Sequence, residues 1–316
     1  MHTQRFFPAA LPILLLLLFC LARPARSQQA TGVPVRMTVT VEAKHGDEIP
    51  SITRQDVIVN QGHDHRPVTD WVPATGNRAG LELALLMDDS SGFSLGTQLN
   101  DMRTFVTQQP PSTLIAIGYM QNGTVYLTQN FTQDHAAAAK AIRLPQAFAG
   151  AEASPYFSLS QMVKRWPVNP STPRREVLMI TSGIDTFYGG GYPDPYVDTA
   201  IHDAQCGDIP VFSIYTPAVG HFGHSFWRIN WGQNYLSETA EETGAESYYF
   251  LGPQAPVSFQ PYLNKLSRQL TQQFLLTFLA QPEKKATTES VKISSEIHSV
   301  DLLAADKVCV PASPGQ

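Results

Sequence analysis

Residues 81–92 constrain the fold more than any other segment, because a nearly continuous apolar run ends there in an acidic turn. They read Leu-Glu-Leu-Ala-Leu-Leu-Met-Asp-Asp-Ser-Ser-Gly. A short apolar run bounded by turn residues is typical of a strand buried on both faces, as in a parallel sheet covered by helices. Because ligands of such sheets bind beyond the carboxyl ends of the strands, Asp88 and Ser90 are expected at a binding site.

Two interpretations of this turn stay open. Asp88 and Ser90 are two residues apart, so both side chains can point to one side and share a Mg²⁺ or Ca²⁺ ion. The same residue types also suit a strand-to-helix turn and a helix N-cap that hold no metal at all.

The first 27 residues are typical of a secretory signal peptide. Arg5 precedes an apolar run at residues 9–22, which is shorter than the roughly 20 residues that a membrane span needs. The small residues Ala25 and Ser27 predict cleavage after Ser27, and no second apolar segment of this kind follows. We therefore expect a secreted, periplasmic or cell-envelope protein without a membrane span after cleavage.

Charge and cysteine content narrow the function classes. Charged residues make up 16% of the chain and the formal net charge is −5. Nucleic-acid binding would show as a basic stripe, so we expect no nucleic-acid partner.

Cys206 and Cys309 follow the predicted cleavage point, and they can form one disulfide or remain two thiols. Neither belongs to a Cys-x-x-Cys motif, so a structural zinc site is not predicted.

Strand and helix patterns predict a central α/β part between two β-rich flanks. Early strands are expected at 33–41 and 56–59. The central part alternates strands at 81–87, 114–120, 125–130, 176–181, 211–216 and 247–250 with helices at 97–107, 135–142, 156–165, 195–206, 235–243 and 261–271. This alternation predicts an α/β fold with a doubly wound, mainly parallel sheet.

The late strands, expected at 274–280, 291–297 and 307–310, can pair with the early ones in one small β-rich module. The predicted organisation is a signal peptide at 1–27, an N-terminal β-rich segment at 28–79, an α/β domain at 80–254, and a helix with a C-terminal β tail at 255–316. The oligomeric state is left open.

The order of these motifs resembles a von Willebrand factor type A domain. The matching segments are Leu-Met-Asp-Asp-Ser-Ser at 86–91, Ala-Ser-Pro-Tyr at 153–156, Leu-Met-Ile-Thr-Ser-Gly-Ile-Asp at 178–185 and Val-Phe-Ser-Ile-Tyr at 211–215. More narrowly, the chain is similar to exported von Willebrand factor A-related proteins of Acidobacteria, whose N-terminal β segment is matched at 42–46 and 54–62. The resemblance implies a Rossmann-like fold and a non-enzymatic binding or adhesion function.

The resemblance also implies a metal-ion-dependent adhesion site, of which this chain keeps only part. That site uses an Asp-x-Ser-x-Ser loop, a Thr, and an Asp from a Thr-Asp-Gly turn. Asp88 and Ser90 match the first two ligands, but Gly92 stands in place of the second Ser. Ser154 can replace the Thr, whereas Ser182 stands where the second Asp would be. Because carboxylate number sets affinity for hard cations, Mg²⁺ or Ca²⁺ is expected to bind weakly.

Asp89 and Asp185 lie close enough in the sequence to replace the missing carboxylate. The candidate metal ligands are Asp88, Ser90 and Ser154, and the candidate binding residues are Asp88, Ser90, Ser154, Ser182 and Asp185. Aromatic residues on nearby loops favour a binding surface at the same face, and these are Phe187, Tyr188, Tyr192, Phe222, Phe226 and Trp227. The expected partner is a protein or an extracellular polymer.

Two rival functions remain. His221 and His224 lie three residues apart in a Gly-rich loop, so a secreted metal-dependent hydrolase using this loop with Asp185 is one of them. A structural envelope component without a ligand site is the other. The sequence lacks a His-Glu-x-x-His motif, a nucleophile elbow and a phosphate-binding glycine loop. Ser182 is the candidate nucleophile by placement, but helix capping explains it better, so a non-enzymatic protein is favoured.

Overall fold

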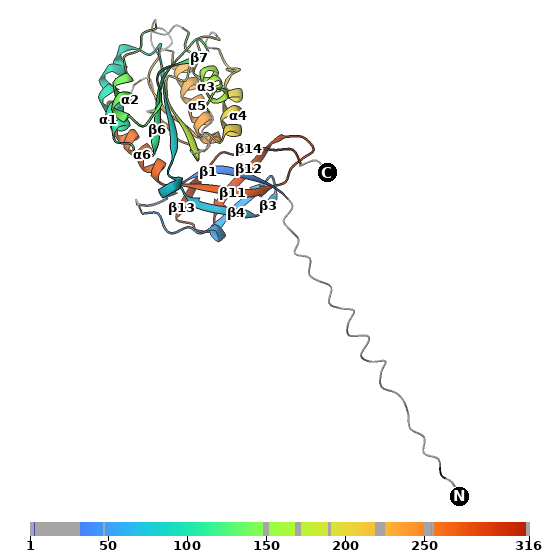
Figure 1. Ribbon diagram of the computed structural model, residues 1–316. Helices are drawn as coiled ribbons and strands as arrows, with labels where there is room; N and C mark the ends of the chain where they lie inside the picture. The colour runs from blue at the N-terminus through green and yellow to red at the C-terminus, as the bar shows by residue number, and fades with distance from the viewer. Residues whose placement is uncertain are drawn as a thin grey trace. The chain divides into compact units, whose positions relative to one another are not determined.

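The computed structural model describes residues 3, 32–46, 48–147, 152–167, 172–188, 191–218, 225–249, 254 and 256–313. From Gly32 onward the chain forms one compact unit (Figure 1). The predicted signal peptide lies outside the described residues, apart from Thr3, and so do Phe222 and the histidine pair His221 and His224. Within the described ranges, no helix is both long enough and apolar enough to cross a lipid bilayer.

A six-stranded sheet forms the centre of the α/β part, in the order β10-β9-β8-β5-β6-β7. Its middle strand, β5 (Leu81–Asp88), has all eight residues buried, as expected between parallel neighbours. The other strands are β6 (Thr113–Gln121), β7 (Thr124–Thr132), β8 (Arg174–Thr181), β9 (Val211–Tyr215) and β10 (Ser247–Tyr248). All neighbouring pairs are parallel except β6 and β7.

Alternate residues of β5 pack against helices on opposite faces of the sheet. Leu83 and Leu85 belong to one apolar core, and Ala84 and Leu86 belong to the other. The first face is covered by α1 (Leu99–Thr107), α2 (His135–Ala141) and α6 (Gln260–Thr271), and the second by α3 (Pro155–Lys164), α4 (Val197–Gly207) and α5 (Phe226–Glu242) (Figure 1). The predicted doubly wound α/β fold is confirmed.

The two ends of the chain form two further sheets, in the orders β13-β1-β11-β4 and β14-β12-β2-β3. Their strands are β1 (Val33–Ala43), β2 (Val57–Gln61), β3 (Asp64–Arg66), β4 (Val68–Pro73), β11 (Gln273–Ala280), β12 (Thr287–Ser295), β13 (Val300–Leu303) and β14 (Lys307–Val310). Strand β1 pairs with β11 and β13, and β2 pairs with β12. The expected pairing of early and late strands is therefore confirmed, whereas the domain boundaries at 79/80 and 254/255 stay a prediction.

The early strand β1 supplies the core of these two sheets. Val35, Met37, Val39 and Val41 are buried in one cluster with side chains of β2, β11 and β12. Their spacing of two places them on one face of the strand, as predicted. In the part of the chain that the structure describes, short 3-10 helices connect elements at η1 (Arg54–Asp56), η2 (Gly76–Arg78) and η3 (Phe93–Gln98).

Helix α5 differs most from its prediction, because it begins at Phe226 instead of residue 235. Its buried face includes Ile229, Gly232, Gln233 and Leu236. Since Gly and Gln occupy two of these inner positions, the apolar period of a helix is interrupted. Ser225 stands at the N-cap, but its side chain makes no hydrogen bond to the first turn.

The disulfide question is settled by the structure, where Cys206 and Cys309 form a disulfide. Their Cα atoms lie 4.9 Å apart, and the bond joins α4 to β14. Of the two alternatives that the sequence left open, the paired one is found. The α/β part is thereby tied covalently to a strand of the terminal sheets.

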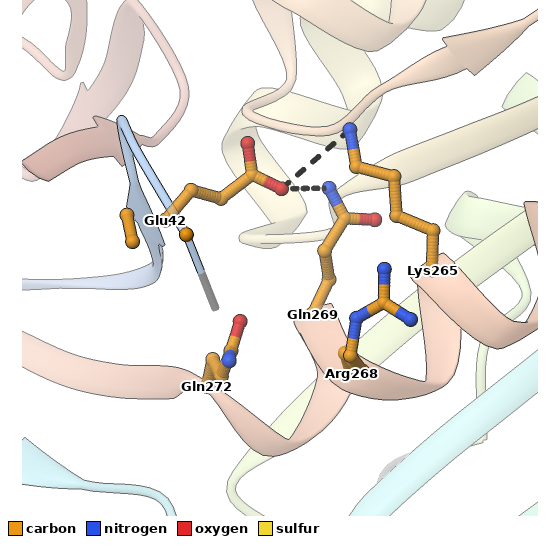
Figure 2. Close-up of a pocket in the computed structure, with 7 residues that line it drawn as sticks. Glu42, Lys265, Arg268, Gln269 and Gln272 are labelled. Carbon is orange, nitrogen blue, oxygen red and sulfur yellow. Dashed lines mark hydrogen bonds and ion pairs between the residues drawn. The ribbon is translucent and has the colours of Figure 1, made fainter. Parts of the chain in front are cut away.

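A polar pocket of about 170 Å³ lies where β1 faces α6 (Figure 2). Glu42 Oε1 accepts a hydrogen bond from Gln269 Nε2 at 2.8 Å and lies 3.8 Å from Lys265 Nζ. The Lys265 ammonium also pairs with Glu246 at 2.5 Å. These charges are compensated by one another, so we interpret the pocket as a joint between α6 and the terminal sheets.

Candidate binding site

Asp88 ends β5 and anchors the turn that the sequence singled out. Its side chain is buried, and Oδ1 accepts hydrogen bonds from Ser90 N at 2.9 Å and Ser90 Oγ at 2.6 Å. Oδ2 accepts a hydrogen bond from Thr181 Oγ1 at 3.0 Å. Met87 of β5 pairs with Ile180 of the parallel strand β8, so the residues that follow them, Asp88 and Thr181, lie side by side on one face of the sheet. Thr181 is a site residue that sequence reasoning missed.

The chain itself satisfies the Asp88 carboxylate. Burial raises its pKa and nearby Asp89 adds to this, while the hydrogen bonds from Ser90 and Thr181 oppose it. Both carboxylate oxygens already accept hydrogen bonds from protein groups. A hard cation binds best to several free oxygens, so this donor set fits Mg²⁺ or Ca²⁺ poorly.

Ser154 and Ser182 make hydrogen bonds away from Asp88. Ser154 is fully buried at the N-cap of α3, and its Oγ accepts a hydrogen bond from Gly123 N at 2.5 Å. This bond holds the β6–β7 turn against the start of α3. The Oγ of Ser182 accepts a hydrogen bond from Ile184 N at 3.3 Å. Both hydroxyls therefore stabilise loops at the carboxyl ends of the strands.

The two carboxylates proposed as substitutes have different surroundings. Asp89 forms an ion pair with Arg143, with Oδ1 and Nη1 2.7 Å apart, and also accepts from Gln146 N at 2.9 Å. Asp185 Oδ1 accepts from Tyr188 N at 2.9 Å, but its buried Oδ2 has no hydrogen-bond partner. Asp185 therefore keeps one carboxylate oxygen whose hydrogen-bonding capacity the described residues do not use.

The pKa of Asp185 reflects these surroundings. Burial raises it to about 7, and the negative charges of Asp194 and Asp88 add to the increase. The charge of Asp88 contributes to the raised pKa of Asp185, so the two carboxyl groups interact electrostatically. Among the described residues, no hydrogen bond joins them. Their charges repel, so both are not readily ionised together without a cationic partner.

Asp194 is a second acidic residue that sequence reasoning missed. Its Oδ1 accepts a hydrogen bond from Tyr196 N at 2.8 Å, whereas its buried Oδ2 has no partner. Burial raises the pKa of this carboxyl also. Asp185 and Asp194 line a small hollow of about 10 Å³ together with Arg228 and Trp231. No sequence motif marks Asp194, since it comes to the site only through the fold of the loop before α4.

Among the described residues, five exposed aromatic side chains lie on the segments that follow β8 and β9. They form the aromatic cluster, Phe187, Tyr188, Tyr192, Phe226 and Trp227, with exposed fractions of 46%, 53%, 65%, 67% and 69%. Tyr192 stacks on Trp231 and Tyr235, with ring centroids 5.4 and 6.0 Å apart. Because the cluster follows the carboxyl ends of parallel strands, it belongs to the same end of the sheet as Asp88.

Two glycines let α5 approach the loop after β8. A Cβ at Gly232 would lie 2.2 Å from the carbonyl oxygen of Ser182, and a Cβ at Gly183 would lie 2.3 Å from that of Gly232. Gly183 also has φ +70°, which other residues rarely adopt. The small residues therefore fix the loop that carries Asp185 against the helix.

Gly232→Ala is expected to lower the free energy of unfolding by about 1–3 kcal/mol, because the new methyl group must push α5 away from Ser182. Urea unfolding followed by circular dichroism measures the loss. Gly191→Ala is the matched control, since a Cβ there meets nothing within 4 Å. An equal loss in both variants would contradict the close-packing argument.

Comparisons with known proteins add structural likenesses only. No protein-family model and no curated protein matches the chain. An aerotolerance-related membrane protein from Bacteroides fragilis NCTC 9343 is similar in structure, with 12% identity, a TM-score of 0.43, and 60% of this chain and 98% of that chain covered. BatB from Bacteroides thetaiotaomicron is 11% identical with a TM-score of 0.44, and the match covers 61% of this chain and 98% of that chain. The SpRpn10 VWA domain is 9% identical with a TM-score of 0.36, and the match covers 59% of this chain and 94% of that chain. No function is carried over from these likenesses.

Proposed function

We propose that the chain is an exported, non-enzymatic binding protein built on a von Willebrand factor A-like domain, which recognises a protein or an extracellular polymer. Export rests on the signal-peptide pattern of residues 1–27. The family assignment, including the narrower likeness to the Acidobacterial proteins, rests on the motifs around Asp88, Ser154 and Ser182. The doubly wound sheet order agrees with such a domain.

The aromatic cluster is the observation that carries the binding proposal. Large aromatic side chains exposed together are typical of interaction surfaces, since water solvates them poorly. Tyr and Trp contribute large contact areas at low conformational cost, and they are frequent hot spots of interfaces. Behind them, Asp185 and Asp194 each hold a buried carboxylate oxygen without a hydrogen-bond partner, so a ligand would reach these oxygens only if the loops around them moved.

Recognition is proposed not to require a tightly held Mg²⁺ or Ca²⁺ ion. The candidate ligands Asp88 and Ser90 hydrogen-bond to each other, and Asp88 is also bound by Thr181. Ser154, the third candidate ligand, holds the β6–β7 turn through Gly123. In a complete adhesion site a ligand carboxylate completes the metal shell. Here aromatic and hydrogen-bonding contacts would supply the affinity instead.

The test is capture of material from cell-envelope extracts by the immobilised chain. The double variant Tyr192→Ala/Trp227→Ala is expected to reduce capture of the bound component by about tenfold or more, because loss of even one hot-spot side chain costs about 2 kcal/mol or more. Tyr126→Ala is the control, since this tyrosine is 56% exposed but lies on the edge strand β7. Protease or polysaccharide-hydrolase treatment of the extract distinguishes a protein partner from a polymer.

Two outcomes would overturn the proposal. Equal capture by the wild type and the double variant would remove the aromatic cluster from recognition. A metal-dependent adhesion site would be shown instead if a chelator abolished capture by the wild type and Mg²⁺ or Ca²⁺ restored it. In that case Asp88→Ala should not capture the component even with the metal ion present. Capture that persists in the chelator agrees with the proposed metal-independent surface.

A further inference from the structure

His202 lies beside the disulfide that joins α4 to β14. His202 and Cys206 are one helical turn apart on α4, so they share one face of the helix. The Cys206 sulfur lies 3.6 Å from His202 Nε2 and 3.9 Å from its Nδ1. The potential ligand atoms of His202, Cys206 and Cys309 all lie within 4.8 Å of one another. The fold therefore gathers an imidazole and two sulfurs at one point.

A threonine sets the orientation of this imidazole. Thr288 on β12 pairs with Cys309 across the two strands. Its Oγ1 lies 3.4 Å from His202 Nδ1 and 3.7 Å from the Cys309 sulfur. When the hydroxyl accepts the Nδ1 proton, Nε2 is the unprotonated ring nitrogen and carries the lone pair that can bind a metal ion. Metal-binding histidines usually donate their second ring proton to such an oxygen, which fixes the tautomer.

The donor set defines the class of ion. Two thiolates and a neutral imidazole suit Zn²⁺ and other thiophilic ions, whereas the oxygen groups at the Asp88 face suit hard cations. Three protein ligands leave a fourth position of a tetrahedral site to water. His202 and Cys206 are exposed and Cys309 is half-buried, so reductants and metal ions can reach the cluster.

We propose that the reduced chain binds one Zn²⁺ ion through His202, Cys206 and Cys309, so that the metal replaces the disulfide as the link between α4 and β14. A dithiol or phosphine reductant supplies two electrons, the sulfur–sulfur bond breaks, and each sulfur takes up one proton. Zinc then binds the two thiolates and displaces both protons. The link is thus exchanged between an oxidised covalent form and a reduced metal form.

The test uses the full chain after reduction with a metal-free phosphine, with Co²⁺ as spectroscopic probe and Zn²⁺ as competitor. The reduced chain is expected to bind one Co²⁺ with thiolate charge-transfer bands and tetrahedral d–d bands, whereas the oxidised chain shows neither. His202→Ala should weaken Zn²⁺ binding by about tenfold or more, since even outer-shell partners contribute this much. His298→Ala, at another exposed histidine, is the matched control.

Stability and secondary structure complete the test. Zn²⁺ should raise the melting temperature of the reduced wild type and have no effect on the oxidised chain. Circular dichroism shows whether the reduced chain stays folded, and Zn²⁺ should restore the native spectrum if it does not. Equal Zn²⁺ affinity of the wild type and His202→Ala would overturn the proposal. So would equal binding by the oxidised and reduced chains, or a reduced chain that Zn²⁺ neither stabilises nor refolds.

Discussion

Replacing Arg174 by methionine is expected to lower the free energy of unfolding by about 3–5 kcal/mol, because a buried acid is left without its partner. Arg174 and Glu176 are 4% and 0% exposed, and Arg174 Nη1 lies 4.0 Å from Glu176 Oε1. Arg174 also donates to the carbonyl oxygens of Leu270 at 2.8 Å and Ala79 at 2.9 Å, and to the Gln273 side chain. One guanidinium thus joins β8 to α6 and β11.

The loss should depend on pH. Burial raises the pKa of Glu176 to about 7, from an ordinary value of 4.5. A raised folded-state pKa means that this carboxyl favours the folded state most below pH 4.5, and that the contribution is lost as the pH rises through about 7. Removing Arg174 should raise the pKa further. The variant is therefore expected to lose less stability at pH 5 than at pH 8.

Urea unfolding at both pH values measures this difference. The double variant Arg174→Met/Glu176→Gln should recover part of the loss at pH 8, because the buried charge is gone. Arg175→Met is the matched control, since Arg175 on the same strand donates to the Gly207 carbonyl oxygen at 2.6 Å. Equal losses at both pH values without recovery would mean that Arg174 acts through its carbonyl contacts alone.

The fold was predictable where one periodicity dominates. In β5 the apolar run indicated a strand buried on both faces, and the structure buries all eight residues between two parallel neighbours. In β1 the alternation of Val35, Met37, Val39 and Val41 indicated one inward face. The start of α5 was not predictable in this way, because Gly232 and Gln233 fill inner positions where helices usually place apolar side chains.

The site was predictable only where its contacts are local. Asp88 and Ser90 are two residues apart, and the structure joins them by hydrogen bonds. Thr181 reaches Asp88 through strand register, and Asp89 meets Arg143 across 54 positions of sequence. Such partners depend on how strands and loops assemble, and no spacing in the sequence encodes them. The position of Asp194, whose buried Oδ2 has no hydrogen-bond partner, likewise depends on how the loop before α4 folds and not on a sequence motif.

Loss of the disulfide is expected to lower the free energy of unfolding by about 2–5 kcal/mol. Cys206 and Cys309 are 103 positions apart, and closing a loop of this length removes much entropy from the unfolded chain. Other contacts hold β14 near the helices, since Gln205 of α4 donates to Asp306, the residue before β14, at 2.7 Å and Lys307 of β14 pairs with Glu242 of α5 at 3.1 Å. The folded state should therefore survive reduction, and the loss should arise mainly from the unfolded chain.

Denaturant unfolding of the wild type with and without a phosphine reductant measures this loss in metal-free buffer. The double variant Cys206→Ser/Cys309→Ser should match the reduced wild type and show no response to reductant. A decrease below about 1 kcal/mol would contradict the entropic argument. Zn²⁺ separates this effect from the proposed metal link, because it should stabilise the reduced wild type but not the double serine variant. Stabilisation of the serine variant by Zn²⁺ would instead assign the ion to another site.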